Sequence, residues 1–394
     1  MAYKTIKKCR LCESERLSKL FSLGNLSIST FVYKKDDNIG KTPLELVWCK
    51  KCTLVQLRHT PSQELLYSGN YWYESGLNQV IVEDLKDIVD KGMKLSSSGG
   101  TWIDIGANDG TLLSFVPKSY YRIGIEPANN LRKKLAKNCD SAIYQFWEET
   151  SLSLKASVIT AIGMFYDAED PNIFIRNVAG HLDSDGIFIA QMMTAKSMLE
   201  KNDVGNICHE HLEYYSYRSL KTLFEKNGLE IFKVEENTIN GGSYRLYARH
   251  YHNGSISYRE RITINDYAAF FDRIKKNKKD CIRFIKSQVK KGKKIYGYGA
   301  STKGNTILQW YGLGPKDIRG IAEIHPEKLG KLTVGTNIPI VAEEDARKDA
   351  DFFLVLPYAF KQFFINEREW SKYRDGFIFA TPFFEVINGK QKVG

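Results

Sequence analysis

The sequence lacks any long apolar run, and its first residues form no apolar leader. The apolar stretch 350–358 is much shorter than the ~18 to 20 residues that a membrane helix needs. Hydrophobic residues (43%) and charged residues (26%) lie close to globular averages, which excludes disordered, collagen-like and coiled-coil chains. We therefore expect a cytoplasmic protein without a membrane partner, and the 394 residues predict two or three domains.

Acidic residues are the minority among the charges, with 46 Asp and Glu against 57 Lys and Arg and a net charge of +11. Such an excess indicates either nucleic acid or an anionic small molecule as partner. Lysine clusters at 275–279 and 290–294 adjoin a stretch of helical periodicity, 270–289. This placement favours a solvated helix face over a binding patch, so we expect no nucleic-acid partner.

Cysteine is scarce, but four of the seven residues form two CxxC pairs, Cys9/Cys12 and Cys49/Cys52. In a cytosolic chain such pairs indicate metal or redox chemistry rather than a disulfide framework. A redox CxxC opens a helix, and neither pair does so. Strand-like stretches adjoin both pairs, which predicts two knuckles around one Zn²⁺ rather than unliganded thiols.

The middle of the chain alternates strands and helices, which predicts a parallel sheet with crossover helices. One strand ends at Asp104 and leads into a turn with Gly106, Asn108 and Gly110. Glycines let a ligand approach the backbone, and the following helix start offers free amides. Glu126 ends the next strand, 22 residues after Asp104, where an acid can bind ribose hydroxyls.

The spacing in this turn differs from the dinucleotide pattern G-x-G-x-x-G. The pattern D-x-G-x-x-x-G is typical of class I methyltransferases, which bind S-adenosylmethionine (SAM). NAD remains the rival cofactor, and a turn without any ligand remains the structural alternative.

A dense group of titratable residues follows at 207–218, ICHEHLEYYSYR. His209 and His211 are two residues apart, so this is not a zincin motif, but on an extended chain both would share one face. Histidine suits general-base catalysis near neutral pH, and Glu210 can fix its tautomer. The alternatives are surface residues that open a helix, or a second metal site.

Two later glycine-rich turns carry polar side chains. Ser243 and Arg245 follow Gly-Gly in a predicted hairpin, where arginine offers a bidentate fork to hydroxyls or a diphosphate. Ser301 and Lys303 stand where a second strand–turn–helix unit begins its helix, a position suited to a phosphate. A purely structural role is the alternative for both turns.

Taken in order, these motifs resemble the sugar C-methyltransferases that act on nucleotide-linked keto-deoxysugars. The likeness covers essentially the whole chain and includes YWYESG at 71–76, DIGANDG at 104–110, HEH at 209–211, GGSYR at 241–245 and GYGASTKGN at 297–305. It implies an α/β fold with a class I Rossmann-like core. Its three domains would be a zinc-binding domain (1–70), a SAM-dependent methyltransferase domain (71–255) and a C-terminal Rossmann-like substrate-binding domain (256–394).

The resemblance also implies a reaction and a set of roles. A base, here His211, would remove the proton next to the ketone of a nucleoside-diphosphate 4-keto sugar, and the enolate would attack the methyl group of SAM. Glu210 would orient that base, with His209 beside it, and Tyr73 would serve as donor to the enolate. Phe146 would join the cofactor site, and the protein would be a monomer or homodimer.

Two positions depart from the family pattern. Cys208 stands where a tyrosine usually precedes HEH, and the segment GMFYD at 163–167 places Tyr166 or Asp167 where an active-site histidine is usual. We expect Tyr166 to contact the substrate. Three alternatives remain open at this point: a non-sugar or oxygen acceptor, a zinc-ribbon nucleic-acid-binding protein, and a non-catalytic protein that binds nucleotide sugars.

Overall fold

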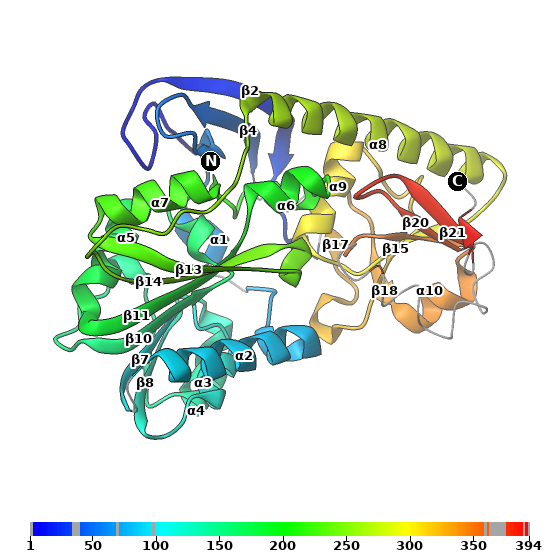
Figure 1. Ribbon diagram of the computed structural model, residues 1–394. Coiled ribbons are helices and arrows are strands. Elements are labelled where there is room, and N and C mark those ends of the chain that lie inside the picture. The colour runs from blue at the N-terminus through cyan, green and yellow to red at the C-terminus, as the bar shows by residue number, and fades with distance from the viewer. Residues whose placement is uncertain are drawn as a thin grey trace.

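The computed structural model describes residues 3–33, 40–67, 71–96, 99–357, 361, 376–388 and 391–392. Figure 1 shows three units: a small N-terminal sheet in blue, a central sheet between helices in cyan and green, and a C-terminal unit in orange and red. The helix labelled α8 (Ile264–Lys290) runs along the upper edge from the first unit to the third.

The central unit is built on seven strands. They are β7 (Gly100–Ile105), β8 (Tyr120–Ile125), β9 (Ser141–Ile143), β10 (Ala156–Ile162), β11 (Leu182–Met193), β13 (Leu229–Asn237) and β14 (Ser243–His250). Their order in the sheet is β13-β14-β11-β10-β7-β8-β9, with five parallel strands and an antiparallel hairpin at one edge. The expected parallel sheet and hairpin are both confirmed.

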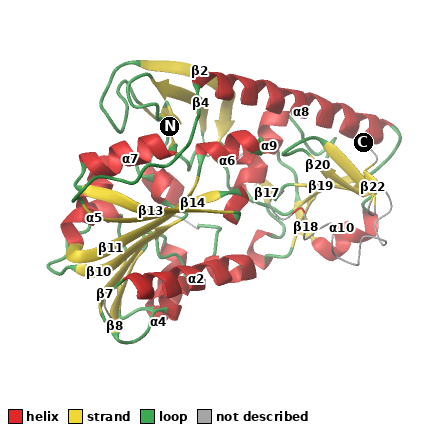
Figure 2. Ribbon diagram, viewed as in Figure 1, coloured by secondary structure: helices red, strands yellow, loops and turns green. Residues whose placement is uncertain are grey.

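Helices cover both faces of this sheet, as Figure 2 shows. They are α2 (Gln79–Leu95), α3 (Thr111–Phe115), α4 (Arg132–Asn138), α5 (Pro171–His181), α6 (Ala195–Glu200) and α7 (Tyr217–Lys226). Because strand side chains alternate between faces, Ile103 and Ile105 join the core with α5 and α7, whereas Trp102 joins the core with α2 and α3. The result is a doubly covered α/β layer structure.

The strand order reverses between β7 and β10. The chain builds β8 and β9 on one side of β7 and then returns to place β10 on the other side. In open α/β sheets a crevice forms at this reversal, outside the carboxyl ends of the strands. The turn after β7 and the loop after β10 therefore flank the predicted ligand position.

The C-terminal unit repeats this plan on a smaller scale. Its elements are β15 (Ile295–Tyr298), α9 (Thr302–Tyr311), β16 (Ile321–Glu323), β18 (Ile340–Ala342), α10 (Glu343–Asp349), β19 (Phe352–Val355), β20 (Gly376–Phe379), β21 (Glu385–Asn388) and β22 (Gln391–Lys392). The sheet order is β18-β16-β15-β19-β20-β21-β22, so the order reverses between β15 and β19. The expected Rossmann-like character is confirmed, and Ser301 stands at this second reversal.

The N-terminal unit contains a four-stranded antiparallel sheet. Its elements are β1 (Lys4–Thr5), β2 (Leu17–Ser27), β3 (Phe31–Val32), β4 (Lys41–Cys49), β5 (Val55–Leu57), β6 (His59–Thr60) and α1 (Gln63–Tyr67). The sheet order is β12-β5-β4-β2, in which β12 (Glu213–Tyr214) comes from the middle of the chain. In addition, β17 (Leu332–Thr333) pairs with β3, so both other units complete sheets of the first.

The two domain limits expected from the sequence, at residues 70 and 255, fall in different kinds of segment. The limit at residue 70 lies outside the described residues, while the limit at 255 falls in a loop, 251–263, without helix or strand. One apolar core joins the N-terminal sheet to α8 and to the C-terminal sheet. Within it, Phe21 stacks on Phe271 at 4.5 Å between ring centroids, and Trp48 contacts Tyr267 edge-on.

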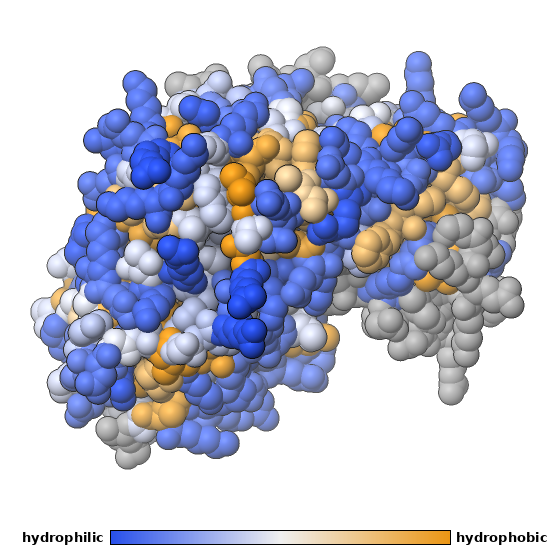
Figure 3. Space-filling view, turned by 45° about the horizontal axis from the view of Figure 1, so that its top comes forward, coloured by the Kyte–Doolittle hydropathy of each residue, from blue (hydrophilic) through white to orange (hydrophobic). Residues whose placement is uncertain are grey.

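Figure 3 shows a mainly hydrophilic face on which hydrophobic residues gather in separate small patches. Within the part of the chain that the structure describes, no helix is both long enough and apolar enough to span a bilayer.

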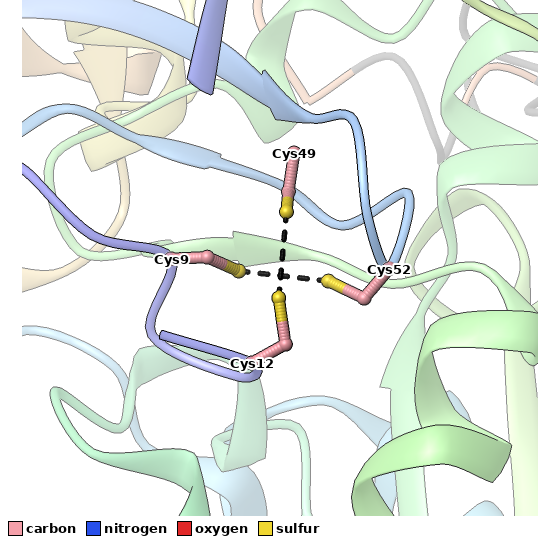
Figure 4. A group of neighbouring side chains, drawn as sticks. All are labelled: Cys9, Cys12, Cys49 and Cys52. Atoms are coloured by element: carbon pink, nitrogen blue, oxygen red, sulfur yellow. Dashed lines mark hydrogen bonds between the residues drawn. The ribbon is translucent and has the colours of Figure 1, made fainter. Parts of the chain in front are cut away.

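The four cysteines of the CxxC pairs converge at one point of the N-terminal unit (Figure 4). The Sγ atoms of Cys9 and Cys52 are 3.5 Å apart, as are those of Cys12 and Cys49. Four sulfurs bound ~2.3 Å from a tetrahedral zinc would lie about 3.8 Å apart, so the set fits Zn²⁺. Gln56 donates from Nε2 to Sγ of Cys9 at 3.2 Å, an outer contact typical of a thiolate ligand.

Replacing Cys49 by serine tests this metal centre. Its side chain is fully buried, and Cys49→Ser removes one of four ligands from a unit whose core is small. We expect the variant to lose its zinc by elemental analysis and to melt more than about 5 °C below the wild type, because ligation contributes directly to folding. Cys139→Ser, outside the cluster, should retain both properties; a zinc-loaded Cys49→Ser of unchanged Tm would contradict the assignment.

Candidate functional site

A cavity of about 750 Å³ opens at the strand reversal of the central sheet. Its walls come from the ends of β7, β8, β9 and β10 and from the segment before α2. Of the residues that we predicted for the cofactor, Gly106, Asn108, Glu126 and Phe146 line it. The crevice rule therefore locates this cavity correctly from the strand order alone.

Two glycines of the turn after β7 are required by its geometry. Gly106 has φ +68°, and a Cβ there would lie 2.6 Å from Cγ of Met164. Gly110 has φ +80°, and its Cβ would lie 2.7 Å from Cβ of Asn138. A side chain at Gly106 would therefore be strained and would crowd the cavity, whereas Gly110 lets α3 start close to α4.

Glu126 is buried and organises this turn through both of its oxygens. Oε2 accepts from the backbone N–H of Asn108 at 3.0 Å, and Oε1 accepts from that of Ala128 at 2.9 Å. Burial is the main effect on the pKa of Glu126, which is raised. Each carboxylate oxygen has a second lone pair, so ribose hydroxyls can still be accepted from the cavity side.

Asp104 does not line the cavity, contrary to our expectation of a direct contact. It lies beneath the turn, where Oδ1 accepts from Oγ1 of Thr160 at 2.6 Å. Burial raises the pKa of Asp104 to about 7. Asp104 therefore joins β7 to β10 through this hydrogen bond, which explains its place in the motif.

Asn108 ties the segment 71–76 to the turn. Its Nδ2 donates to the carbonyl of Tyr73 at 3.0 Å, and its Oδ1 accepts from the N–H of Ser75 at 2.9 Å. Tyr71 and Tyr73 thereby come to line this cavity and two neighbouring ones. Both polar atoms of the Asn108 side chain therefore form hydrogen bonds with the protein backbone.

A second cavity, of about 830 Å³, shares a wall with the first. Tyr71, Tyr73, Gly163 and Asp167 are among the residues that line both. The predicted residues Tyr166, Glu210, His211, Ser243 and Lys303 also line the second cavity. The structure therefore brings most of the predicted catalytic and substrate residues together beside the first cavity.

His211 is held as a neutral base. Its Nδ1 contacts the backbone carbonyl of Asn206 at 2.8 Å and the side-chain oxygen of Asn206 at 2.9 Å. Two acceptors at Nδ1 hold the proton there, which leaves the lone pair on Nε2. Burial, reinforced by Lys303, lowers the pKa of His211 to about 3. The ring of Tyr166 packs edge-on against it at 4.6 Å.

Glu210 and Cys208 lie close to His211. One potential ligand atom from each of the three lies within 4.8 Å of the others, a spacing that a metal ion would also satisfy. The charge of Lys303 acts on all three groups, and its Nζ lies 3.1 Å from Sδ of Met193. Because this ammonium already balances the cluster, we interpret it as a proton-transfer group; burial raises the pKa of Glu210 to about 7.

His209 does not share the face of His211, so our expectation of a common face is wrong. Its Nε2 contacts the backbone carbonyl of Thr42 at 2.9 Å, and it lines none of the three cavities described. Burial lowers the pKa of His209 to about 4. The loop bends between the two histidines, and His209 fastens it to the N-terminal sheet.

Arg245 also differs from its expected role. Its guanidinium donates to Oε1 of Gln191 at 2.8 Å, to Asp84 at 2.7 Å and to Asp87 at 2.5 Å, and only 3% of the side chain is exposed. All three nitrogens are engaged, so no free fork faces a diphosphate. Ser243 does line the second cavity, although its hydroxyl donates to the carbonyl of Ile239 at 3.0 Å.

A third cavity, of about 1370 Å³, lies between the N-terminal and C-terminal units. Ser301 lines it while its hydroxyl accepts from the N–H of Gly304 at 3.0 Å, which caps α9. Two lysines that the sequence did not single out, Lys328 and Lys331, line it as well. Nζ of Lys331 lies 4.2 Å from the ring centre of Trp72, a contact between distant segments that no local motif signals.

Comparison with known proteins matches three successive parts of the chain. A C-methyltransferase C-terminal domain matches residues 238–382, a methyltransferase domain matches 77–234 and a zinc binding domain matches 9–67. C-methyltransferase NovU from Streptomyces niveus is 27% identical, and the alignment covers 98% of each chain.

Solved methyltransferase structures are similar at lower sequence identity. An S-adenosylmethionine-dependent methyltransferase from Clostridium acetobutylicum is 12% identical, with a TM-score of 0.38 over 43% of this chain and 92% of that chain. Magnesium protoporphyrin IX methyltransferase ChlM from Synechocystis is 12% identical, with a TM-score of 0.34 over 44% and 79%.

The three domain matches follow one another along the chain, and NovU matches across nearly its full length. The central sheet and the four-cysteine cluster supply the corresponding cofactor crevice and metal site. The chain is therefore a SAM-dependent methyltransferase with a zinc-binding domain, and it is similar along nearly its whole length to a C-methyltransferase.

Proposed function

We propose that the protein methylates the carbon next to the ketone of a nucleoside-diphosphate 4-keto-deoxysugar. The observation that carries the proposal is the shared wall between two cavities, one at the cofactor crevice and one containing the neutral base His211. A carbon acid needs a base within reach of its proton and a methyl donor within reach of the same carbon. The two adjoining cavities provide these two positions.

Bound SAM supplies an electrophilic methyl group. Nε2 of His211 takes the proton from the carbon next to the ketone, and Asn206 keeps the opposite nitrogen protonated throughout. Glu210, half-buried in the same cavity, relays that proton onward to solvent. Tyr73, on the wall common to both cavities, positions the sugar against the cofactor.

The cofactor is held at the strand reversal. Gly106 gives the close backbone approach, Glu126 accepts the ribose hydroxyls and Phe146 supplies an apolar face for the adenine. The residues present fit the group, because backbone, carboxylate and aromatic groups line one cavity at the strand reversal.

The nucleotide half of the substrate occupies the third cavity. That cavity joins the catalytic one at Tyr71, Glu210 and Thr302, so a sugar attached to a diphosphate can extend through both. The start of α9 at Ser301 and the ammonium of Lys331 suit the diphosphate, and aromatic side chains suit a base. Lys303 faces His211 and therefore acts on the sugar end rather than on the diphosphate.

Glu126→Gln tests the cofactor position. The amide keeps the shape of the side chain but replaces one accepting oxygen, which weakens a charge-assisted contact worth ~1.5 to 3 kcal/mol. We expect SAM to bind about 10- to 100-fold more weakly by titration calorimetry. Glu149→Gln, at an exposed site that does not line the cavity, is the matched control and should bind as the wild type does. Equal affinities would place the ribose elsewhere.

His211→Ala tests the base. We expect methyl transfer from SAM to dTDP-4-keto-6-deoxyglucose, followed by mass spectrometry, to fall more than about 100-fold, while SAM affinity stays unchanged. His252→Ala changes an exposed histidine and should keep full activity. Turnover by His211→Ala at the wild-type rate would assign the base to another group.

Lys331→Met tests the nucleotide site while keeping the buried aliphatic stem of the side chain. Loss of the ammonium should raise KM for the nucleotide sugar at least about tenfold and leave kcat nearly unchanged, because the contact lies away from the reacting carbon. Lys316→Met, on an exposed loop, should change neither constant. A fall in kcat at constant KM would instead connect Lys331 with the chemical step.

A further inference from the structure

Asp167 occupies an unusual place between the cofactor cavity and the catalytic cavity. It ends a short 3₁₀ helix, η4 (Phe165–Asp167), which follows β10 at the strand reversal. Asp167 is a buried residue, with only 9% of its surface exposed, and it lines both cavities. Its Oδ1 is buried and has no hydrogen-bond partner among the described residues. A buried unpartnered carboxyl oxygen is costly, so this position calls for a ligand group.

The groups that face Asp167 come from four other parts of the chain. Glu210 belongs to the loop before β12, Glu213 to β12, Lys303 to α9 and Tyr67 to α1. Burial raises the pKa of Asp167 well above its usual range, and the two glutamates act in the same direction. Lys303 and the nearby hydroxyl of Tyr67, which itself donates to the backbone carbonyl of Glu210 at 3.1 Å, oppose this shift without reversing it.

The remaining neighbours are neutral near pH 7. They are the phenols of Tyr71, Tyr166 and Tyr214 and the thiol of Cys208, each with its pKa raised by burial. Burial, the unpartnered Oδ1 and the nearby carboxyl groups of Glu210 and Glu213 therefore favour the protonated form of Asp167, which can act as a donor. A protonated carboxyl in an apolar site is a strong donor to a developing oxyanion.

We propose that Asp167 is a catalytic residue whose carboxyl group donates a hydrogen bond to the enolate oxygen of the substrate. The inference rests on the proposed function of this site. Nε2 of His211 removes the carbon-bound proton, and the electron pair moves onto the ketone oxygen, which Asp167 then binds. The pair returns to form the new carbon–carbon bond as the bond between sulfur and methyl breaks, the ketone re-forms, and the proton on His211 leaves to solvent.

Neighbouring residues are less suited to this task. The phenol of Tyr166 already donates to the carbonyl of Gly163 at 2.7 Å. Of the two adjoining cavities, Lys303 lines only the catalytic one. Asp167 lines the wall common to both, and the methyl group must cross from one cavity to the other there.

The experiment compares Asp167→Asn, Asp167→Ala and the exposed control Asp185→Asn with dTDP-4-keto-6-deoxyglucose as substrate. Asparagine keeps a donor, so we expect it to retain at least about a tenth of kcat and to lose the alkaline limb of the pH profile. Alanine should lose about 100-fold or more in kcat, with SAM affinity unchanged. In Asp167→Ala, the exchange of solvent deuterium into the position next to the ketone, measured with S-adenosylhomocysteine bound, should slow by the same factor as kcat.

The opposite results would overturn the inference. If asparagine is as inactive as alanine, a carboxylate rather than a donor is required. If SAM affinity falls while kcat is kept, Asp167 binds the cofactor. If this deuterium exchange is unchanged in Asp167→Ala, enolate formation does not depend on it.

Infrared difference spectroscopy of the protein without substrate separates this inference from the proposed function. Other buried carboxyl groups also contribute to the carbonyl region, so the spectra are subtracted: the wild type minus Asp167→Asn difference at pH 7 should contain the band of one protonated carboxyl, and the wild type minus Asp185→Asn difference should not. A wild type that shows the band but leaves the sugar unmethylated would contradict the substrate proposal and support the protonated donor. Absence of the band would overturn the donor itself.

Discussion

One short strand pairing holds the catalytic loop in place. Strand β12 pairs with β5 of the N-terminal sheet through Glu213 with Gln56 and Tyr214 with Val55. Just before it, the carbonyl of Leu212 accepts from the N–H of Leu57 at 2.8 Å, and the N–H of Leu212 donates to the carbonyl of Tyr166 at 2.9 Å. The loop with His211 is therefore clamped between the metal-binding unit and the turn that carries Asp167.

The metal centre is connected with this clamp through Gln56. That side chain donates to Sγ of Cys9 and accepts from the N–H of Arg10, while its backbone pairs with β12. Arg10 faces Glu213 across 3.6 Å, with 3% and 0% of the two side chains exposed. A buried pair of this kind contributes little net stability, but breaking it leaves an uncompensated charge. Its geometry therefore restricts where β12, and with it the catalytic loop, can lie.

Local features were predictable from the sequence, and features set by tertiary contacts were not. The glycine turn, the hairpin at Asn240 and the four-cysteine cluster each follow from residue types at short spacing, and the structure reproduces them. His209 and Arg245 have the right chemistry for a site, but their partners, Thr42 and Asp84, are more than a hundred residues away. Lys331 was missed for the same reason, since only folding brings it to a cavity.

Burial and one retained cation together determine the electrostatics of the catalytic cavity. Burial favours the uncharged forms of His211 and Asp167, so on the proposed mechanism neither would add repulsion when negative charge develops on the substrate. Lys303 contributes positive charge to the same space, and the sulfonium of bound SAM would add more from the adjoining cavity. Fixed positive charge stabilises an enolate more than it stabilises a neutral ketone. This difference in stabilisation is the condition for catalysis. Under the proposed function, the basic excess that first suggested an anionic partner would act at the reacting carbon through one lysine, Lys303, which lines the cavity of His211.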